Sequence, residues 1–209
     1  VMVYGEFAQE PAVHLAKELI ALLPDNHHSV YLTNSGTEAI EGALKLAKRA
    51  TGRGELIGAV NSYHGSTQGA LSLLGSEHQK VGYRPLLPNI RFIRFNSEED
   101  LSLITTKTAA VLLETIQGGA GFILPENDFL KKVKDRCEAT GALLILDEIQ
   151  PGFGRTGRFF GFEYFNVKPD IIVLGKGMGG GLPVGAFTAS HELMSLLEDN
   201  PKLGHITTF

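Results

Sequence analysis

Several short segments of this 209-residue sequence are apolar at nearly every position, without the alternation of apolar and polar residues that a half-exposed strand has. The clearest are residues 109–114, 142–147 and 170–174, each of which has one acidic residue at an end. A strand that is apolar on both sides is buried on both faces, as in a parallel sheet covered by helices. We therefore expect an α/β fold with a mostly parallel sheet and helices on both faces.

Segments with helical periodicity separate the predicted strands. Apolar residues at positions 40, 43, 44 and 47 form one stripe of a helix that Gly52 ends. Further helices are predicted at 11–23, 66–74, 98–104, 126–140 and 191–199. Strands are predicted at 30–33, 55–60, 90–95, 109–114, 142–147, 170–174 and 184–189. The sequence has no internal repeat or low-complexity linker, so we expect no domain boundary within it.

Composition and charge argue against several classes of protein. The net charge of -4 provides no basic stripe for nucleic acid. No apolar stretch reaches about 18 residues, which argues against a membrane partner. Cys137 is the only cysteine, so an internal disulfide is excluded and a cytoplasmic location is expected. The seven histidines show no metal-binding spacing, and we expect no metal site.

A lysine and an aspartate follow two of the predicted strands. Lys176 lies among glycines, where the backbone can approach a bulky planar group without Cβ atoms in the way. Asp147 ends the apolar run 142–147. Pyridoxal phosphate (PLP) needs a lysine for its aldehyde and an acidic partner for its pyridinium nitrogen, so the pair suggests this cofactor. Asp147 can equally cap the turn that follows, and its neighbour Glu148 is expected to point elsewhere.

Two further segments offer groups for an anion and for a flat ring. A predicted strand turns through Gly36 directly into a helix, whose N-terminal N–H groups and dipole favour a phosphate. Ser35 and Glu38 also have the spacing of a helix-capping box, which needs no ligand, and both interpretations can hold together. Tyr63 can stack on a planar cofactor or simply pack at a strand end, and His64 is equally ambiguous.

Taken in order, these motifs resemble the class III (subgroup II) PLP-dependent aminotransferases, and acetylornithine and ornithine aminotransferases in particular. The segments that carry the resemblance are Asn34–Ala39, Tyr63–Gly65, Glu114, Asp147–Gln150 and Leu174–Gly177. The resemblance implies fold type I, with residues 1–209 as the large PLP-binding domain. It also implies that the chain is a fragment, without the family's N-terminal segment and C-terminal small domain.

The resemblance also implies roles for individual residues. Lys176 would bond the cofactor and move protons from an apolar, crowded site, and Asp147 would pair with the ring nitrogen, so both are catalytic. Gln150 would lie near the ring oxygen, and Thr208 would reach the phosphate of a neighbouring subunit in a homodimer with shared active sites. The full set of implied cofactor-binding residues is Ser35, Gly36, Thr37, Tyr63, His64, Glu114, Asp147, Gln150, Lys176 and Thr208.

The implied reaction moves an amino group from an ω-amine or amino-acid donor to a keto acid such as 2-oxoglutarate. Two positions depart from the ornithine-type members. Ser66 stands where they carry an arginine for the substrate carboxylate, and Gly119 stands where they carry a glutamate. The amino donor therefore stays open. An aminomutase or decarboxylase of the same family and a non-enzymatic binding domain are the alternatives.

Overall fold

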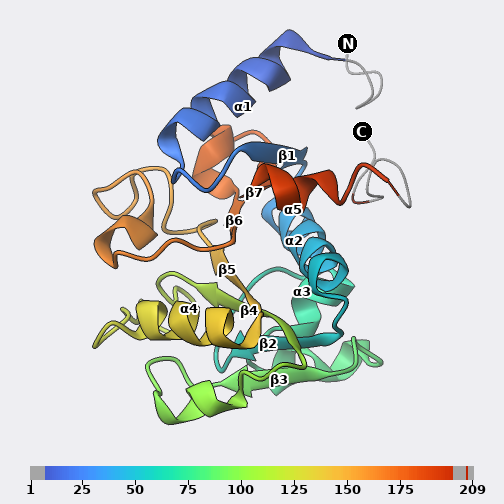
Figure 1. The fold of residues 1–209 in the computed structure, drawn as a ribbon, viewed down its shortest axis with the longest axis vertical. Coiled ribbons are helices and arrows are strands. Elements are labelled where there is room, and N and C mark those ends of the chain that lie inside the picture. Colours follow the sequence, from blue (N-terminus) through green and yellow to red (C-terminus); the bar gives the residue numbers. More distant parts are fainter. Residues whose placement is uncertain (1–7, 200–205, 207–209) are drawn as a thin grey trace.

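The computed structural model describes residues 8–199 and 206, which form one seven-stranded sheet with helices packed on it (Figure 1). The order of the strands across the sheet is β1-β7-β6-β5-β4-β2-β3. Only β7 runs antiparallel to its neighbours, and the other adjacent pairs are parallel. The predicted mostly parallel sheet is therefore confirmed. The strands are β1 (Ser29–Thr33), β2 (Glu55–Ala59), β3 (Ile90–Ile93), β4 (Thr108–Glu114), β5 (Leu143–Asp147), β6 (Ile171–Leu174) and β7 (Gly185–Ala189).

Helices cover both faces of the sheet, as the apolar strands predicted. Helices α2, α3 and α5 pack against one face, whereas α4 and part of α1 pack against the other. Figure 1 shows α4 and α2 on opposite sides of the central strands. None of the helices in the described part of the chain is long and apolar enough to cross a membrane. The helices are α1 (Glu10–Leu22), α2 (Gly36–Thr51), α3 (Gln68–Ser72), α4 (Phe129–Thr140) and α5 (His191–Ser195).

The central strands are apolar throughout because their side chains enter two separate cores. In β5, Leu144 and Leu146 join the core under α4, whereas Ile145 lies between them and joins the core under α2. Ile172 and Val173 of β6 divide between the two cores in the same way. All five side chains are fully buried, and each such burial contributes about 1.5–3 kcal/mol. A charged residue at any of them would be buried without a partner.

Three predicted helices are shorter or of another type. The segment predicted at 98–104 forms a 3₁₀ turn, Glu99–Leu103, whose N-cap makes no side-chain hydrogen bond. The predicted helices 66–74 and 191–199 are reduced to α3 and α5, of five residues each. Helices this short gain little from propagation, so their bounds are set by the contacts they make with the sheet and with α2.

The parallel strands bring their carboxyl ends to one edge of the sheet. Glu114, the last residue of β4, pairs in register with Asp147, the last residue of β5. Asp147 in turn pairs with Val173 of β6, and Lys176 follows that strand two residues after its end. Ligands in α/β folds bind outside this edge, where the loops that follow the strands converge.

Candidate functional site

A buried aspartate–histidine pair lies at the end of β5. Asp147 Oδ2 is 2.8 Å from Nδ1 of His64, and both residues are at most 3% exposed. Asp147 Oδ1 accepts the backbone N–H of Ile149 at 2.9 Å, so the turn-capping interpretation of this residue also holds. A carboxylate can accept about four hydrogen bonds, which leaves capacity for a further donor. Nε2 of His64 is buried and has no hydrogen-bond partner among the described residues.

Glu114 supports the turn that carries Tyr63. Its two carboxylate oxygens accept the backbone N–H groups of Tyr63 and Gly118, each at 3.3 Å. Burial raises the pKa of Glu114 to about 6, and the charge of Asp147 adds to this rise. Glu114 therefore holds the backbone at the site, and the part of the turn that faces outward is the Tyr63 ring.

Glu148 holds the loop that follows β5 through three hydrogen bonds. Its carboxylate accepts the hydroxyl of Thr115 at 2.6 Å and the backbone N–H groups of Gly161 and Phe162 at 2.8 and 2.9 Å. Burial raises the pKa of Glu148 to about 7, although these three hydrogen bonds act in the opposite direction. Glu148 is thus a structural carboxylate next to the Asp147 pair.

The N-terminus of α2 faces the same edge of the sheet. Ser35 caps this helix by accepting the N–H of Glu38 at 3.3 Å, and Glu38 Oε2 accepts the N–H of Asn34 at 2.8 Å. The first N–H groups of a helix have no acceptor within it, so those of Gly36 and Thr37 suit an anion. A Cβ on Gly36 would lie only 2.6 Å from Ile149 Cδ1, so the helix start lies against the residue after the Asp147 turn. The cap and the phosphate cup are compatible.

The turn that carries Tyr63 lies against this helix start. Gly65 has a φ of 129°, and a Cβ there would lie 2.3 Å from Thr37 Oγ1. Thr37 Oγ1 is also 2.7 Å from the hydroxyl of Thr67. Tyr63 is 45% exposed, and its hydroxyl is 3.2 Å from Ser66 Oγ. The exposed Tyr63 side chain is therefore available to contact a flat ligand near the start of α2.

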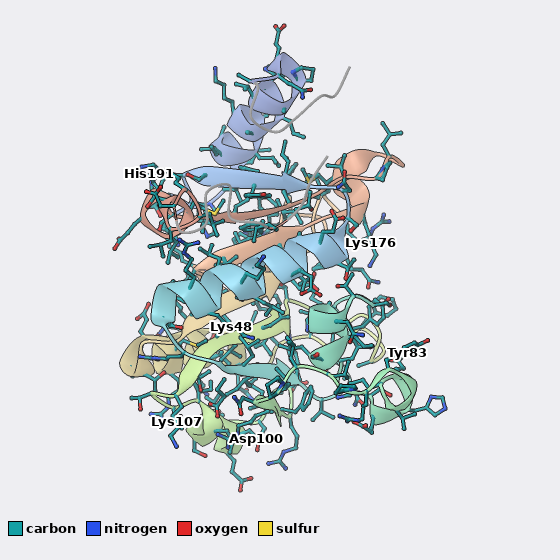
Figure 2. All side chains as sticks on the ribbon, turned by 90° about the vertical axis from the view of Figure 1, so that its right-hand side faces the viewer. Lys48, Tyr83, Asp100, Lys107, Lys176 and His191 are labelled. Atoms are coloured by element: carbon teal, nitrogen blue, oxygen red, sulfur yellow. The ribbon has the colours of Figure 1, made fainter. Side chains whose placement is uncertain are left out.

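Lys176 is exposed in this chain, which corrects the expectation of a crowded, apolar surrounding. The residues beside it are glycines and supply no side chains to cover it. A Cβ on Gly175 would lie 3.2 Å from Gly36 Cα, so the residue before Lys176 touches the start of α2. Figure 2 shows Lys176 at the opposite end of α2 from Lys48. The lysine itself has a φ of 43°, in the left-handed region.

The remaining predicted residues divide between the site and the undescribed part of the chain. Gln150 is exposed and lies over Gly118, where a Cβ would be 2.3 Å from its Oε1. Thr208 lies outside the described residues. Sequence reasoning missed Thr67 and Glu41, which bind the neighbouring helices together and belong to no recognisable motif. Within residues 8–199 and 206, no three His, Cys, Asp or Glu side chains are grouped to hold a metal ion.

The geometry suits one kind of ligand. The α2 N-terminus offers an anion site, the Asp147–His64 pair offers a buried negative charge with an unpartnered ring nitrogen beside it, and Tyr63 offers an aromatic face. Glycines 36, 65 and 175 let the backbones around these groups approach closely. An anionic, planar molecule with a basic ring nitrogen matches all three features.

Several solved structures share this fold. An ornithine aminotransferase from Toxoplasma gondii superposes with a TM-score of 0.89 at 28% identity, over 97% of this chain and 50% of that one. Taurine:2-oxoglutarate aminotransferase from Bifidobacterium kashiwanohense, solved in complex with PLP and glutamate, has a TM-score of 0.84 at 30% identity, over 95% of this chain and 51% of that one.

Curated relatives are closer in sequence. The chain is 44% identical over 176 residues to [LysW]-aminoadipate semialdehyde/glutamate semialdehyde transaminase of Sulfolobus acidocaldarius, covering 84% of this chain and 46% of that protein. It is 45% identical over 164 residues to acetylornithine aminotransferase of Lactiplantibacillus plantarum, covering 78% and 42%. The chain thus spans about half the length of these relatives. The sequence model described as "Aminotransferase class-III" matches residues 1–209, so the chain belongs to the class III aminotransferase family.

Proposed function

We propose that this chain is the large PLP-binding domain of an aminotransferase that moves an amino group from an ω-amine or amino-acid donor to a keto acid such as 2-oxoglutarate. One observation carries the proposal: the buried Asp147–His64 pair, the start of α2 and the lysine after β6 meet at the carboxyl edge of one sheet. The names of the relatives support the reaction class, because they are transaminases of amino-acid derivatives.

The residues present fit PLP. Bound PLP supplies an electron sink that stabilises negative charge on the substrate carbon. Ser35, Gly36 and Thr37 would hold the phosphate with backbone N–H groups, and Tyr63 would contact the ring. Asp147 would pair with the ring nitrogen and favour its positive charge, because a buried carboxylate favours the protonated form of a base beside it. Glu114 and His64 hold this arrangement, and Gln150 lies at its border.

Lys176 performs the proton transfers. Its Nζ would hold the cofactor, whose aldehyde is the group that a lysine amine can bond. The same amine would serve as the base that takes a proton from the substrate carbon and as the acid that gives it back. The glycines around Lys176 leave room for a planar group beside the amine.

We also propose that the protein is a homodimer in which Thr208 reaches the PLP phosphate of the partner subunit. Ile206, which lies two positions before Thr208 in the sequence, packs against α2 close to Gly42. A site built from two chains links dimerisation to PLP binding. Dilution below the dimer dissociation constant should therefore release PLP, and Thr208→Val should weaken its retention at fixed protein concentration. A monomer that holds PLP as tightly as the dimer would exclude the shared site.

The test of the function uses the complete protein that carries this chain. Borohydride reduction followed by peptide mapping should place the pyridoxyl label on Lys176. A label on Lys168, which forms an ion pair with Asp25 at 2.7 Å, would overturn the assignment. A panel of amine donors with 2-oxoglutarate should then yield glutamate. Decarboxylated or isomerised products without glutamate would indicate a decarboxylase or an aminomutase, and the absence of a PLP absorbance band would indicate a binding domain.

A further inference from the structure

We propose that Glu41 is a positioning residue for the PLP site, a proposal that rests on the function proposed above. Glu41 lies in the second turn of α2, the helix whose N-terminus forms the phosphate cup. Its side chain crosses to α3, which packs beside α2 (Figure 1). Oε1 of Glu41 accepts the backbone N–H groups of Gly69 and Ala70 at 2.7 and 3.1 Å.

Glu41 supplies the cap that α3 lacks. The N-cap residue of α3 is Thr67, but its side chain makes no capping hydrogen bond and is 2.7 Å from Thr37 Oγ1 instead. The first N–H groups of a helix need an external acceptor, and a carboxylate is favoured there by the helix dipole. Because Gly69 and Ala70 are buried, removing Glu41 would leave two donors without water or protein partners.

The Glu41 carboxylate leaves no room for a side chain at Gly69. A Cβ on Gly69 would lie 2.1 Å from Glu41 Oε2, and the three atoms nearest to it all belong to the Glu41 carboxylate. Glycine at this position therefore lets the carboxylate rest directly on the backbone of α3. This close approach, together with the Thr37–Thr67 contact, fixes the start of α3 to the start of α2.

The segment fixed in this way carries the aromatic wall of the site. Residues 63–67 lie in the connection between β2 and α3, with Glu114 holding the N–H of Tyr63 at one end and Glu41 holding α3 at the other. The segment includes His64, the partner of Asp147. Glu41 thus sets the distance between the phosphate cup and the Tyr63–His64 turn without touching the cofactor. It acts through α3.

The same contact compensates a negative charge that lies near the start of α2. Glu41 lies five residues after Gly36, about 7.5 Å along the helix axis. An unbound carboxylate at this distance repels an anion at the helix start, whereas one paired with N–H groups has much of its charge compensated. Freeing the carboxylate from these N–H groups, as Gly69→Ala would, therefore weakens PLP binding by both effects, whereas Glu41→Ala removes the charge and tests the positioning role alone.

The experiment measures PLP affinity of the complete apoprotein by absorbance titration, together with the circular dichroism of bound PLP and the apoprotein melting temperature. Glu41→Ala should weaken PLP binding about tenfold and change the dichroism, because the Tyr63 turn is displaced. Glu41→Gln should restore much of the affinity, since its amide oxygen accepts the same two N–H groups. If Glu41→Ala does not fold, Glu41→Gln and Gly69→Ala carry the test.

The matched control is Asp100→Ala. Asp100 also accepts a backbone N–H, from Arg94 at 2.7 Å, but Figure 2 places it well away from Lys176. It should lower the melting temperature without changing PLP affinity or dichroism. A double-mutant cycle adds a second test: Gly69→Ala should weaken PLP binding in the wild-type background but not in Glu41→Ala, where the clashing carboxylate is gone.

Each outcome decides a different claim. Unchanged PLP affinity and dichroism in Glu41→Ala would overturn the positioning role, as would an equal loss of affinity in Asp100→Ala. An additive effect of Gly69→Ala in both backgrounds would likewise exclude the contact as its cause. Failure of the wild-type protein to bind PLP would instead refute the proposed function, and this inference with it.

Discussion

Replacing Asp147 with asparagine removes one negative charge from the site while keeping the shape of the side chain. Oδ1 of the amide can still accept the N–H of Ile149, so the turn after β5 should stay intact. The amide nitrogen then faces Nδ1 of His64, which must become an acceptor by changing its tautomer. The variant should therefore fold and retain some PLP, but a neutral amide no longer favours a positive charge on the ring nitrogen.

The size of the effect follows from the burial of Asp147, which is only 3% exposed. Opposite unit charges about 4 Å apart, at an effective dielectric constant of about 20, attract each other by about 4 kcal/mol. Since about 1.4 kcal/mol corresponds to a factor of ten, the turnover of the PLP-saturated variant should fall about a thousandfold. The assay is glutamate formation from the best amine donor, normalised to bound PLP. Asp147→Glu, which keeps the charge, should be milder.

The control for this experiment is Asp170→Asn at the opposite edge of the sheet. Asp170 accepts the N–H of Leu144 at 2.8 Å and pairs with Lys134 at 2.7 Å, so its loss should lower stability. Turnover per bound PLP should not change. Near-normal turnover in Asp147→Asn would show that Asp147 acts only as a turn residue and would refute the electrostatic reasoning.

Three further predictions concern positions around the site. Burial raises the pKa of Glu148 to about 7, so the folded state binds this proton more tightly than the unfolded state does, and the free energy of unfolding should fall as pH rises from about 4.5 through 7. The slope from this one group is at most about 1.4 kcal/mol per pH unit. Urea unfolding of Glu148→Gln at several pH values should show that this part of the pH dependence is lost. Gly36→Ala should weaken PLP binding because its Cβ meets Ile149 at 2.6 Å, and adding Ile149→Ala should restore it. Ser66→Arg should raise kcat/KM for ornithine-type donors about tenfold, because the arginine can pair with their carboxylate. Efficient use of ornithine or acetylornithine by the wild-type protein would contradict the inference from Ser66 and Gly119.

The strands and the helix caps could be predicted because their causes are local. In residues 142–147 and 170–174 every position meets an apolar core, so the sequence needs no alternation and reads clearly as buried strand. The Ser35 cap depends only on residues within one helical turn. The segment 98–104 has the same kind of local pattern, but its 3₁₀ geometry depends on what surrounds it.

The contacts that assemble the site join residues far apart in sequence. His64 and Asp147 are 83 positions apart, and their pairing follows from the order of β2, β4 and β5 in the sheet, which local patterns do not specify. Glu41 and Gly69 are 28 positions apart, and their contact depends on how α3 packs on α2. Sequence reasoning therefore finds the residues that carry chemistry more readily than those that position them.

The backbone of Lys176 provides a last test of how function constrains this fold. A φ of 43° costs an L-residue about 1–2 kcal/mol relative to the right-handed region, whereas glycine adopts it freely. Glycine also loses more entropy on folding, by about 0.4–1 kcal/mol. In the apoprotein, Lys176→Gly should therefore be more stable than Lys176→Ala by up to about 1.6 kcal/mol, measured by urea unfolding.

The same pair of substitutions at Lys48 reverses the expectation. Lys48 lies in the last turn of α2, where alanine is favoured over glycine by about 1 kcal/mol (Figure 2). If glycine is more stable than alanine at position 176 and less stable at position 48, the backbone at Lys176 is strained. Such strain lowers the stability of the fold and is typical of residues with a chemical role. If alanine were more stable than glycine at position 176, the left-handed backbone there would carry no strain, and this argument for the role of Lys176 would be lost.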